Sequence, residues 1–586
     1  MTPPHWHFSA LDYREIPGYG AEHLLSRLNS GELRSARFPL LGRGEIPEPS
    51  ASPFMDRVRL TEILNATNGA VAAGTAPATA PAATTTAGRY VVAGQQAGLL
   101  TGPLYTFLKA LTIIRLASDL ETTTGIPHIP LFWMASEDHD LLEVNRCWVN
   151  GRRFVAGDPA SLDAHLARRR QVADEPLTHH RNALCRFVRE SLPENAPFRD
   201  HAVDLVESSS FADYGAHFRS LMLSLFADLG LLIADPLALR PLTAPVLAEL
   251  VARWGDVVAA FADGGAQLRR EGFTPPLAEP GLFEIRDGAR LKIEISPDGA
   301  QLAAGRCSLA ELAAQIRAEP AAFSPNAALR PVLQDAVIPV SAFVAGPTEL
   351  LYLWQIDGIY DVAGTRRALL RPRISATFVE PRVARAARKQ GLAGSRILAA
   401  NDLLHGGAHT TPDTEPNGGT PASHSNGDDA DLQAIERGGD LVLGALDRVL
   451  GTQRNKALER GRAAIASQLE KVAHRIRELK AEAAGRGRRN LETIATALTP
   501  EGKPQERMIT AIELLSRHGP SLVKLALDAL DPWPIAHHLV ETGRSAGEGA
   551  LRERASRSDA SHADRSVNDR DDETRCKNNR HNDQSN

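Results

Sequence analysis

The sequence predicts an α/β protein with a doubly wound, mostly parallel sheet, followed by an all-α C-terminal region. The first observation is a set of continuous apolar runs, such as "IPLFWMAS" at 129–136, that are typical of strands covered on both faces. The second is that amphipathic helical segments and short turns alternate with these runs. The third is a change to helix-only patterning with heptad spacing after residue 430.

The strands and helices of the predicted core follow one another closely along the chain. In chain order they are a strand at 90–93, a helix at 103–121, a strand at 129–136, a helix at 211–229, and strands at 231–236 and 335–347. Asp287-Gly288 separates two alternating runs at 282–295, which predicts a β-hairpin inserted into this core.

Composition divides the chain further. The predicted segments are an N-terminal part of the core at 1–64, an Ala/Thr-rich linker at 65–88, the core with its insertion at 89–405, a disordered insertion at 406–430, a helical coiled-coil region at 431–542 and a disordered tail at 543–586.

The coiled-coil prediction depends on apolar residues at steps of four, three and seven. These are Leu458, Ile465, Leu469, Val472, Ile476 and Leu479, set among Arg, Glu and Lys. They cover about three heptads, near the minimum for such a prediction. An antiparallel helical hairpin and a dimer seam would both satisfy this spacing.

Charge and cysteine content favour a soluble, cytoplasmic protein. The 66 basic and 71 acidic residues give a net charge of −5, so no global basic field predicts nucleic-acid binding. The four cysteines are scattered without a C-x-x-C pair, which argues against a disulfide framework or a zinc site. We see no signal peptide and no apolar run long enough to span a membrane.

A glycine-rich turn follows the strand at 90–93 and precedes a helix. Backbone N–H groups at such a helix start favour an anionic ligand, usually phosphate, and a lysine two turns on could reach it. The candidate cofactor-binding residues are Gly94, Gln95, Gln96, Gly98, Gly102, Pro103 and Lys109. The spacing matches neither the P-loop nor the G-x-G-x-x-G pattern, so a tight turn that serves packing alone is the alternative.

A second cluster, "SEDHDLLEVN" at 136–145, lies where the next strand ends. Ligands bind outside the carboxyl ends of strands in open α/β sheets, which places this cluster beside the glycine turn. The candidate catalytic residues are Glu137, Asp138, His139 and Asp140, and Asn145 is a candidate for substrate binding. They could perform acid/base chemistry or hold a divalent cation. The alternative is a solvated turn in which Asp138 or Asp140 caps the next helix. We predict no metal site.

Further candidates for substrate binding follow along the chain. The segment at 323–335 is expected to be a loop before a strand, with Ser324, Asn326, Arg330, Gln334 and Asp335 as hydrogen-bonding residues. A helix cap and a structural salt bridge would explain them equally well. A strand–glycine–helix junction at 345–355 contributes Glu349, and an arginine-rich segment contributes Arg373. Arg382 and Arg385 in that segment fit a solvated helix face.

Five of these stretches occur in the order seen in one protein family. They are "VVAGQQAGLLTGPLYT", "FWMASEDHDLLEVN", "FSPNAALRPVLQD", "AGPTELLYLWQ" and "RPRISATFVEPRV". In these motifs the chain resembles the BshC family, the enzymes assigned to cysteine addition in bacillithiol biosynthesis. The resemblance runs from about Phe8 to Glu541. Ala93 and Ala328 depart from the residues expected at their positions.

The resemblance implies a Rossmann-like core, as in class I nucleotidyltransferases and aminoacyl-tRNA synthetases, with connecting insertions and a coiled coil that forms a homodimer. It implies a ligase that joins the carboxyl of cysteine to the amine of glucosaminyl-malate through an amide (C–N) bond, with ATP activating the acid. The glycine turn would hold the nucleotide, the EDHD cluster would position the amine or accept its proton, and Arg330 or Arg373 would hold the malate carboxylates. A nucleotidyltransferase and a non-catalytic coiled-coil scaffold are the alternatives.

Overall fold

A computed structural model describes the chain over residues 5–16, 23–33, 39–72, 86–157, 162–163, 169–405, 437–438, 440–448, 451 and 456–544. Two compact units divide it. The first unit comprises Met1–Arg14, Gly18–Pro381 and Lys503–Asn586, and the second comprises Glu15–Pro17 and Arg382–Gly502. The predicted disordered insertion at 406–430 and nearly all of the tail after 543 lie outside the described residues.

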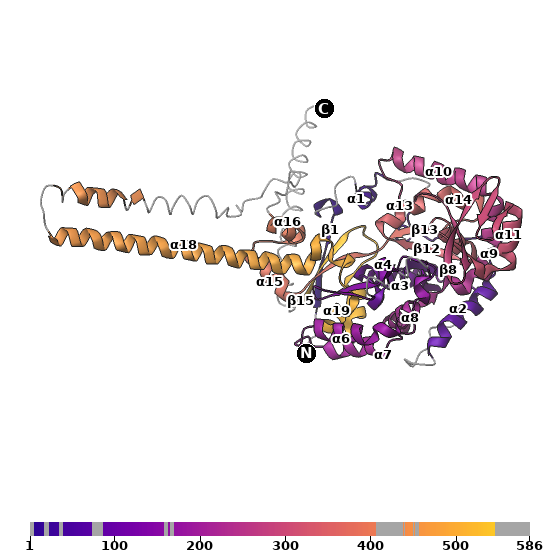
Figure 1. The fold of residues 1–586 in the computed structure, drawn as a ribbon, viewed down its shortest axis with the longest axis horizontal. Coiled ribbons are helices and arrows are strands. Elements are labelled where there is room, and N and C mark those ends of the chain that lie inside the picture. Colours follow the sequence, from indigo (N-terminus) through magenta and orange to yellow (C-terminus); the bar gives the residue numbers. More distant parts are fainter. Residues whose placement is uncertain are drawn as a thin grey trace, which may run out of the picture. The chain divides into compact units, whose positions relative to one another are not determined.

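A five-stranded, all-parallel sheet forms the centre of the first unit (Figure 1). Its strands, in spatial order, are β13 (Leu369–Pro372), β12 (Val340–Ala345), β2 (Arg89–Gln95), β3 (His128–Met134) and β6 (Leu232–Ala234). The chain therefore adds β3 and β6 on one side of β2, and then β12 and β13 on the other side. This is the doubly wound order, and its direction reverses between β2 and β12. The predicted parallel core is confirmed.

Helices supply the apolar layers that bury this sheet. Helix α3 (Leu104–Thr124) packs on β2 and β3. It ends at Gly125, which has a left-handed backbone conformation and whose N–H donates to the Glu121 carbonyl. Other α-helices in the described part of this unit include α1 (Leu24–Asn29), α2 (Arg57–Ala72), α4 (Leu141–Val144), α6 (Arg181–Ser191), α7 (Arg199–Ser208), α8 (Tyr214–Phe226), α9 (Pro236–Ala252), α10 (Trp254–Arg270), α11 (Leu309–Ala318), α12 (Arg330–Val337), α13 (Pro347–Gln355), α14 (Asp357–Val362), α19 (Ala511–His518) and α20 (Leu522–Ala529).

The predicted hairpin is confirmed and belongs to a second sheet. Asp287 and Gly288, both with positive φ, connect β7 (Leu282–Arg286) to β8 (Ala289–Ser296). This sheet also contains β9 (Gly299–Leu302), β10 (Gly305–Cys307) and β11 (Phe323–Pro325). A separate two-stranded hairpin pairs β4 (Arg146–Val149) with β5 (Arg152–Val155).

The structure differs from the predicted segments in three places. From Lys503 onward the chain belongs to the first unit, where helices α19 and α20 are followed by a strand, β15 (His537–Arg544). This strand lies between β1 (His5–Leu11) and β14 (Ser375–Val379) in a three-stranded sheet. Residues 65–72, placed in a linker, complete helix α2, where Asn68 bonds the backbone of Ile233. The expected loop at 323–335 instead forms strand β11 and helix α12.

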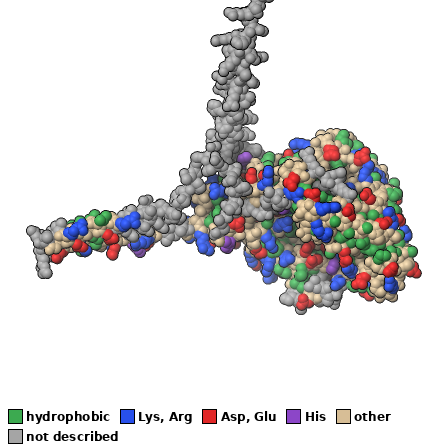
Figure 2. Space-filling model, turned by 90° about the horizontal axis from the view of Figure 1, so that it is seen from above, with side chains coloured by type: hydrophobic (Ala, Val, Ile, Leu, Met, Phe, Trp, Pro, Cys, Tyr) green, Lys and Arg blue, Asp and Glu red, His purple; other side chains and the backbone are tan. Residues whose placement is uncertain are grey.

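The second unit contains α15 (Pro381–Lys389), α16 (Ala400–Leu404) and the 43-residue helix α18 (Lys456–Leu498). The predicted heptad residues all lie on α18, where Ile465 is 39% and Val472 is 49% exposed. Figure 2 shows hydrophobic side chains on this helix between charged ones. A single chain therefore leaves part of the predicted seam uncovered, and the homodimer remains a prediction.

Two further observations concern the surface. On the face that Figure 2 presents, basic and acidic side chains of the first unit are interspersed rather than gathered by sign. None of the helices in the described ranges is both long and apolar enough to cross a bilayer.

One close backbone contact fixes helix α13, whose N-terminal half faces the carboxyl edge of the sheet. A Cβ added to Gly264 on α10 would lie 2.0 Å from the carbonyl oxygen of Gln355, at the end of α13. Only glycine allows this approach, because the atom in the way is backbone.

We expect Gly264→Ala to lower the free energy of unfolding by about 2–3 kcal/mol, since α10 and α13 must separate to admit the methyl group. Gly255→Ala is the matched control, because a Cβ there meets no atom within 4 Å on the same helix. It should change stability by less than about 1 kcal/mol. Urea unfolding of both variants measures the difference, and equal effects would contradict the contact argument.

Candidate active site

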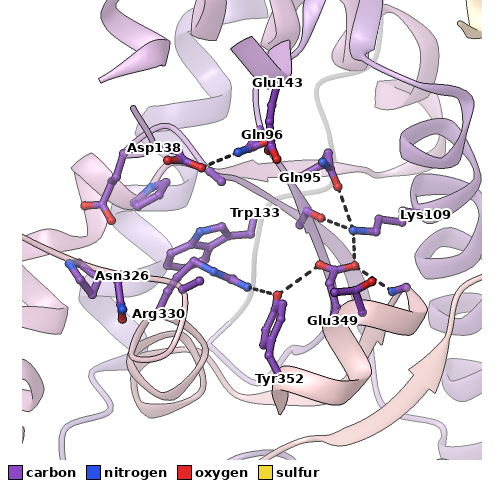
Figure 3. Close-up of a pocket in the computed structure, with 18 of the residues that line it drawn as sticks. Gln95, Gln96, Lys109, Trp133, Asp138, Glu143, Asn326, Arg330, Glu349 and Tyr352 are labelled. Carbon is purple, nitrogen blue, oxygen red and sulfur yellow. Dashed lines mark hydrogen bonds and ion pairs between the residues drawn. The ribbon is translucent and has the colours of Figure 1, made fainter. Parts of the chain in front are cut away.

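A cavity of about 650 Å³ opens at the carboxyl edge of the central sheet (Figure 3). Gly94 and Gln95 end β2 and Gln96 follows it, Gly346 follows β12 and Arg373 follows β13. The lining residues that follow β3 are Ala135, Glu137, Asp138 and His139. Phe283 and Arg290 reach the cavity from the hairpin of the second sheet. The cavity thus lies at the switch point between β2 and β12, where doubly wound sheets bind their ligands.

Lys109 on α3 is buried in the cavity wall, with its side chain 2% exposed. Its Nζ donates to the Gly94 carbonyl at 2.7 Å and to Gln95 Oε1 at 3.1 Å, and it lies 2.5 Å from Glu349 Oε2 (Figure 3). The same Glu349 carboxylate accepts the Gly346 N–H at the start of α13. Burial lowers the pKa of Lys109, and Glu349 opposes that shift. The ion pair therefore joins the end of β2 to the start of α13.

Arg330, on the first turn of α12, lies between two aromatic rings. Its guanidinium carbon is 5.8 Å from the Trp133 centroid and 5.9 Å from the Phe343 centroid. Its hydrogen bonds go to neutral groups. They are the Tyr352 hydroxyl at 3.2 Å (Figure 3) and Gln334 Oε1 at 3.3 Å. Among the described residues it forms no ion pair with a carboxylate. The cavity therefore presents a cation that its own wall does not neutralise.

Asp138 and His139 form a connected polar group. Asp138 accepts a bond from Gln96 Nε2 at 2.5 Å and one from the His139 N–H at 2.7 Å (Figure 3). Arg290 donates to His139 Nδ1 at 3.1 Å and lies 3.7 Å from Asp138. Burial lowers the pKa of His139, and the Arg290 charge lowers it further. The neutral imidazole is therefore favoured.

Two other carboxylates at this edge differ in their surroundings. Glu137 is buried, and Arg240 on α9 donates to it at 2.9 Å while also bonding Gln171. Burial raises the pKa of Glu137, and the charge of Arg240 opposes that shift. The two side chains therefore neutralise each other. Desolvation also raises the pKa of Glu143, which lines the cavity with Gln96 beside it.

Arg373, by contrast, is already neutralised. It makes two bonds to the buried Glu506 carboxylate, at 2.6 and 2.9 Å. Burial alone would raise the pKa of Glu506, but Arg373 and the Ser375 hydroxyl lower it to about 2. This bidentate pair anchors the β13–β14 connection, so of the two arginines expected to bind malate only Arg330 faces the cavity without a carboxylate partner among the described residues.

Two models of a known protein family match this chain, one in its Rossmann-like part and one in its C-terminal part. Residues 46–374 match the model of the BshC N-terminal Rossmann-like domain, and residues 444–542 match that of the BshC C-terminal coiled-coil domain, both described under bacillithiol biosynthesis. This chain belongs to the BshC family.

Relatives in this family span most of the chain. A protein of Koribacter versatilis, named "Putative cysteine ligase BshC", is 31% identical over 76% of this chain and 82% of its own length. Proteins of the same name from Salinibacter ruber and Bacillus pumilus are 30% and 28% identical, over 77% and 74% of this chain and 82% and 81% of their own lengths.

More than half of the residues predicted for a BshC site do line the cavity. They are Gly94, Gln95, Gln96, Lys109, Glu137, Asp138, His139, Asn326, Arg330, Glu349 and Arg373. The predicted residues outside the lining are Gly98, Gly102, Pro103, Asp140, Asn145, Ser324, Gln334 and Asp335.

The second half of the glycine turn does not form the expected phosphate cradle. A Cβ on Gly98 would lie 2.9 Å from the Cα of Gly102, so these two glycines allow a tight backbone crossing. The first N–H of α3, on Leu104, donates to the Ile509 carbonyl rather than facing the cavity. Packing explains this part of the turn, which was the alternative interpretation.

The remaining predicted residues support the wall from behind. Ser324 accepts a bond from Arg290, and Gln334 bonds both Arg330 and Asp335. Burial raises the pKa of Asp335 to about 6. Asn145 holds the Ala156 carbonyl, while Asp140 precedes α4 with no side-chain bond to its first turn.

Sequence reasoning missed several BshC residues that line the cavity: Tyr105, Trp133, Glu143, Phe283, Arg290, Tyr352 and Arg507. Two of them carried a local signal. Tyr352 follows Glu349 by three residues on one helix face, and Glu143 lies within the acidic cluster itself. Phe283 and Arg290 lie far along the chain, and only the fold of the hairpin brings them to the cavity.

Removing one member of the Lys109–Glu349 pair should be more harmful than removing both. Glu349→Gln leaves a buried ammonium without its carboxylate and should cost about 3–5 kcal/mol of unfolding free energy. Lys109→Met combined with Glu349→Gln should recover at least about 1 kcal/mol relative to that single variant. Denaturant unfolding of the two singles and the double gives the coupling energy, and strict additivity would refute the ion-pair account.

Proposed function

We propose that this chain is a ligase that joins the carboxyl of cysteine to the amine of glucosaminyl-malate, with ATP activating the carboxyl. Its relatives bear the name of a cysteine ligase, and the domain models are described under bacillithiol biosynthesis. The amide forms when the amine nitrogen attacks the carboxyl carbon. A C–N bond is made, the C–O bond to the activating group breaks, and the nitrogen releases a proton.

One observation carries this proposal for the amine substrate. Arg330 is held between Trp133 and Phe343 at the switch point, and its hydrogen-bond acceptors are uncharged. A guanidinium in that state is matched by a carboxylate, which it can grip with two parallel hydrogen bonds. Glucosaminyl-malate supplies such carboxylates, whereas Arg373 is occupied by Glu506. We therefore assign malate recognition to Arg330.

The residues present also fit an anionic nucleotide. Lys109, Arg290, Arg330 and Arg507 line the cavity, and the start of α13 contributes Gly346 to Thr348. The indole Nε1 of Trp133 is buried without a hydrogen-bond partner among the described residues. Gly94, Gln95 and Gln96 remain the candidates for nucleotide binding from the predicted turn, and ATP would supply the free energy that amide formation needs.

The direct test is a mass-spectrometric assay of the purified chain with cysteine, glucosaminyl-malate and ATP. We expect the cysteine adduct to form together with AMP or ADP, which also identifies how the acid is activated. A nucleotide attached to the sugar product would instead identify a nucleotidyltransferase. Absence of any product from well-folded protein, with a bona fide family member active in parallel, would overturn the proposal.

Arg330→Lys should raise the KM for glucosaminyl-malate about 10- to 100-fold and change kcat much less, because lysine keeps the charge but cannot form the bidentate contact. Arg382→Lys is the control, since Arg382 is exposed on α15 outside the cavity lining. Unaltered KM in Arg330→Lys, measured by steady-state kinetics, would place malate binding elsewhere.

A further inference from the structure

Arg290 contacts His139 at one ring nitrogen, Nδ1. The guanidinium comes from β8 of the hairpin and is itself fixed, because Nε donates to Ser324 Oγ at 3.0 Å and Nη2 to the Pro325 carbonyl at 2.6 Å. Its plane lies over the Phe283 ring, 3.9 Å from the centroid. The remaining Nη1 donates to His139 Nδ1. Arg290 is therefore anchored by two acceptors on β11 and by an aromatic ring before it contacts the imidazole.

This contact determines where the imidazole proton lies. A guanidinium has five N–H donors and no acceptor, so His139 Nδ1 must present its lone pair to Arg290. In a neutral imidazole one nitrogen accepts and the other carries the proton. His139 therefore carries its proton on Nε2, and its one basic lone pair is engaged by Arg290.

The surroundings of His139 favour the neutral form of its imidazole. Asp138 and Asp140 on the same segment favour a protonated ring, while Arg290 on β8 and Arg169 disfavour it. Burial disfavours it most, and the net pKa of His139 lies below its usual value. Near pH 7 the ring is thus neutral, and the Phe283 ring packs beside it without adding a charge.

We infer that Arg290 is a positioning residue that holds His139 as a hydrogen-bond donor, through Nε2–H, to an anionic oxygen of the ligand, and not as the base. This inference rests on the proposed ligase function for the identity of that oxygen, which belongs to the acid substrate or to its leaving group. The proton released by the amine must then pass to another acceptor. Two carboxylates that line the cavity can take it: Asp138, which accepts the His139 N–H, and Glu143.

The tautomer can be measured without any activity. In protein labelled with ¹⁵N-histidine, long-range ¹H–¹⁵N correlation distinguishes a protonated Nε2 from a protonated Nδ1, and the His139→Gln variant assigns the signals. We expect Nε2–H in the wild type between pH 6.5 and 8. Arg290→Met should shift His139 toward a tautomer mixture or a higher pKa, whereas Arg286→Met, on the same hairpin but outside the cavity lining, should not. Nδ1–H in the wild type would overturn the inference.

Enzyme kinetics provide a second test of the donor role of His139. His139→Gln keeps a donor but cannot serve as a base, so kcat should stay within about tenfold of the wild type, while His139→Ala, which loses the donor, should lose about 100-fold. Equal loss in both variants, with circular dichroism unchanged, would assign the base to His139 and refute the donor role. If the wild type gives no product, the ligase proposal fails, yet the tautomer measurement still decides the role of Arg290.

Discussion

The buried ammonium of Lys109 is the contact on which the geometry of this cavity depends. A lysine that is 2% exposed is tolerated only when acceptors replace the water it has lost. The Gly94 carbonyl and Gln95 come from one side of the switch point, and Glu349 comes from the other. Because Glu349 also accepts the Gly346 N–H, one charge fixes both the end of β2 and the first turn of α13. Both of these elements line the cavity.

Charge pairing separates the residues that build the wall from those that face a ligand. Glu137 is bound by Arg240 and Arg373 by Glu506, each pair buried and supplied with further hydrogen bonds. Such pairs add no net charge to the cavity, and they fix the ends of β3 and β13. Arg330 has no such partner in the described part of the chain, and the aromatic rings beside it do not neutralise its charge. The positive charge left over therefore lies where an anionic substrate can reach it.

The sequence predicted where this site lies better than it predicted which residues form it. The prediction that "GQQ" and "EDH" meet at one edge of the sheet was correct, because the direction of a parallel strand fixes which edge its last residues reach. The same logic could not tell that Gly98 and Gly102 pack against each other, since glycine permits both tight packing and ligand approach. It could not find Glu506 as the partner of Arg373, because 133 residues and a second unit separate them in the chain. Arg290 could not be predicted as a site residue for a related reason. It reaches the cavity only because the β7–β8 hairpin folds there.

That hairpin changes the chemistry expected from the acidic cluster. An isolated Asp-His-Asp sequence favours a histidine that takes up a proton, because both neighbours stabilise the imidazolium. Arg290 reverses the preference by engaging Nδ1 and by adding a positive charge, and burial acts in the same direction. Desolvation at the same wall raises the pKa of Glu143, which makes this carboxylate a stronger base than it would be in water. The two environments thus narrow the ordinary difference in pKa between a carboxylate and an imidazole. In the reaction we propose, a carboxylate then accepts the amine proton while the imidazole donates to the developing negative charge.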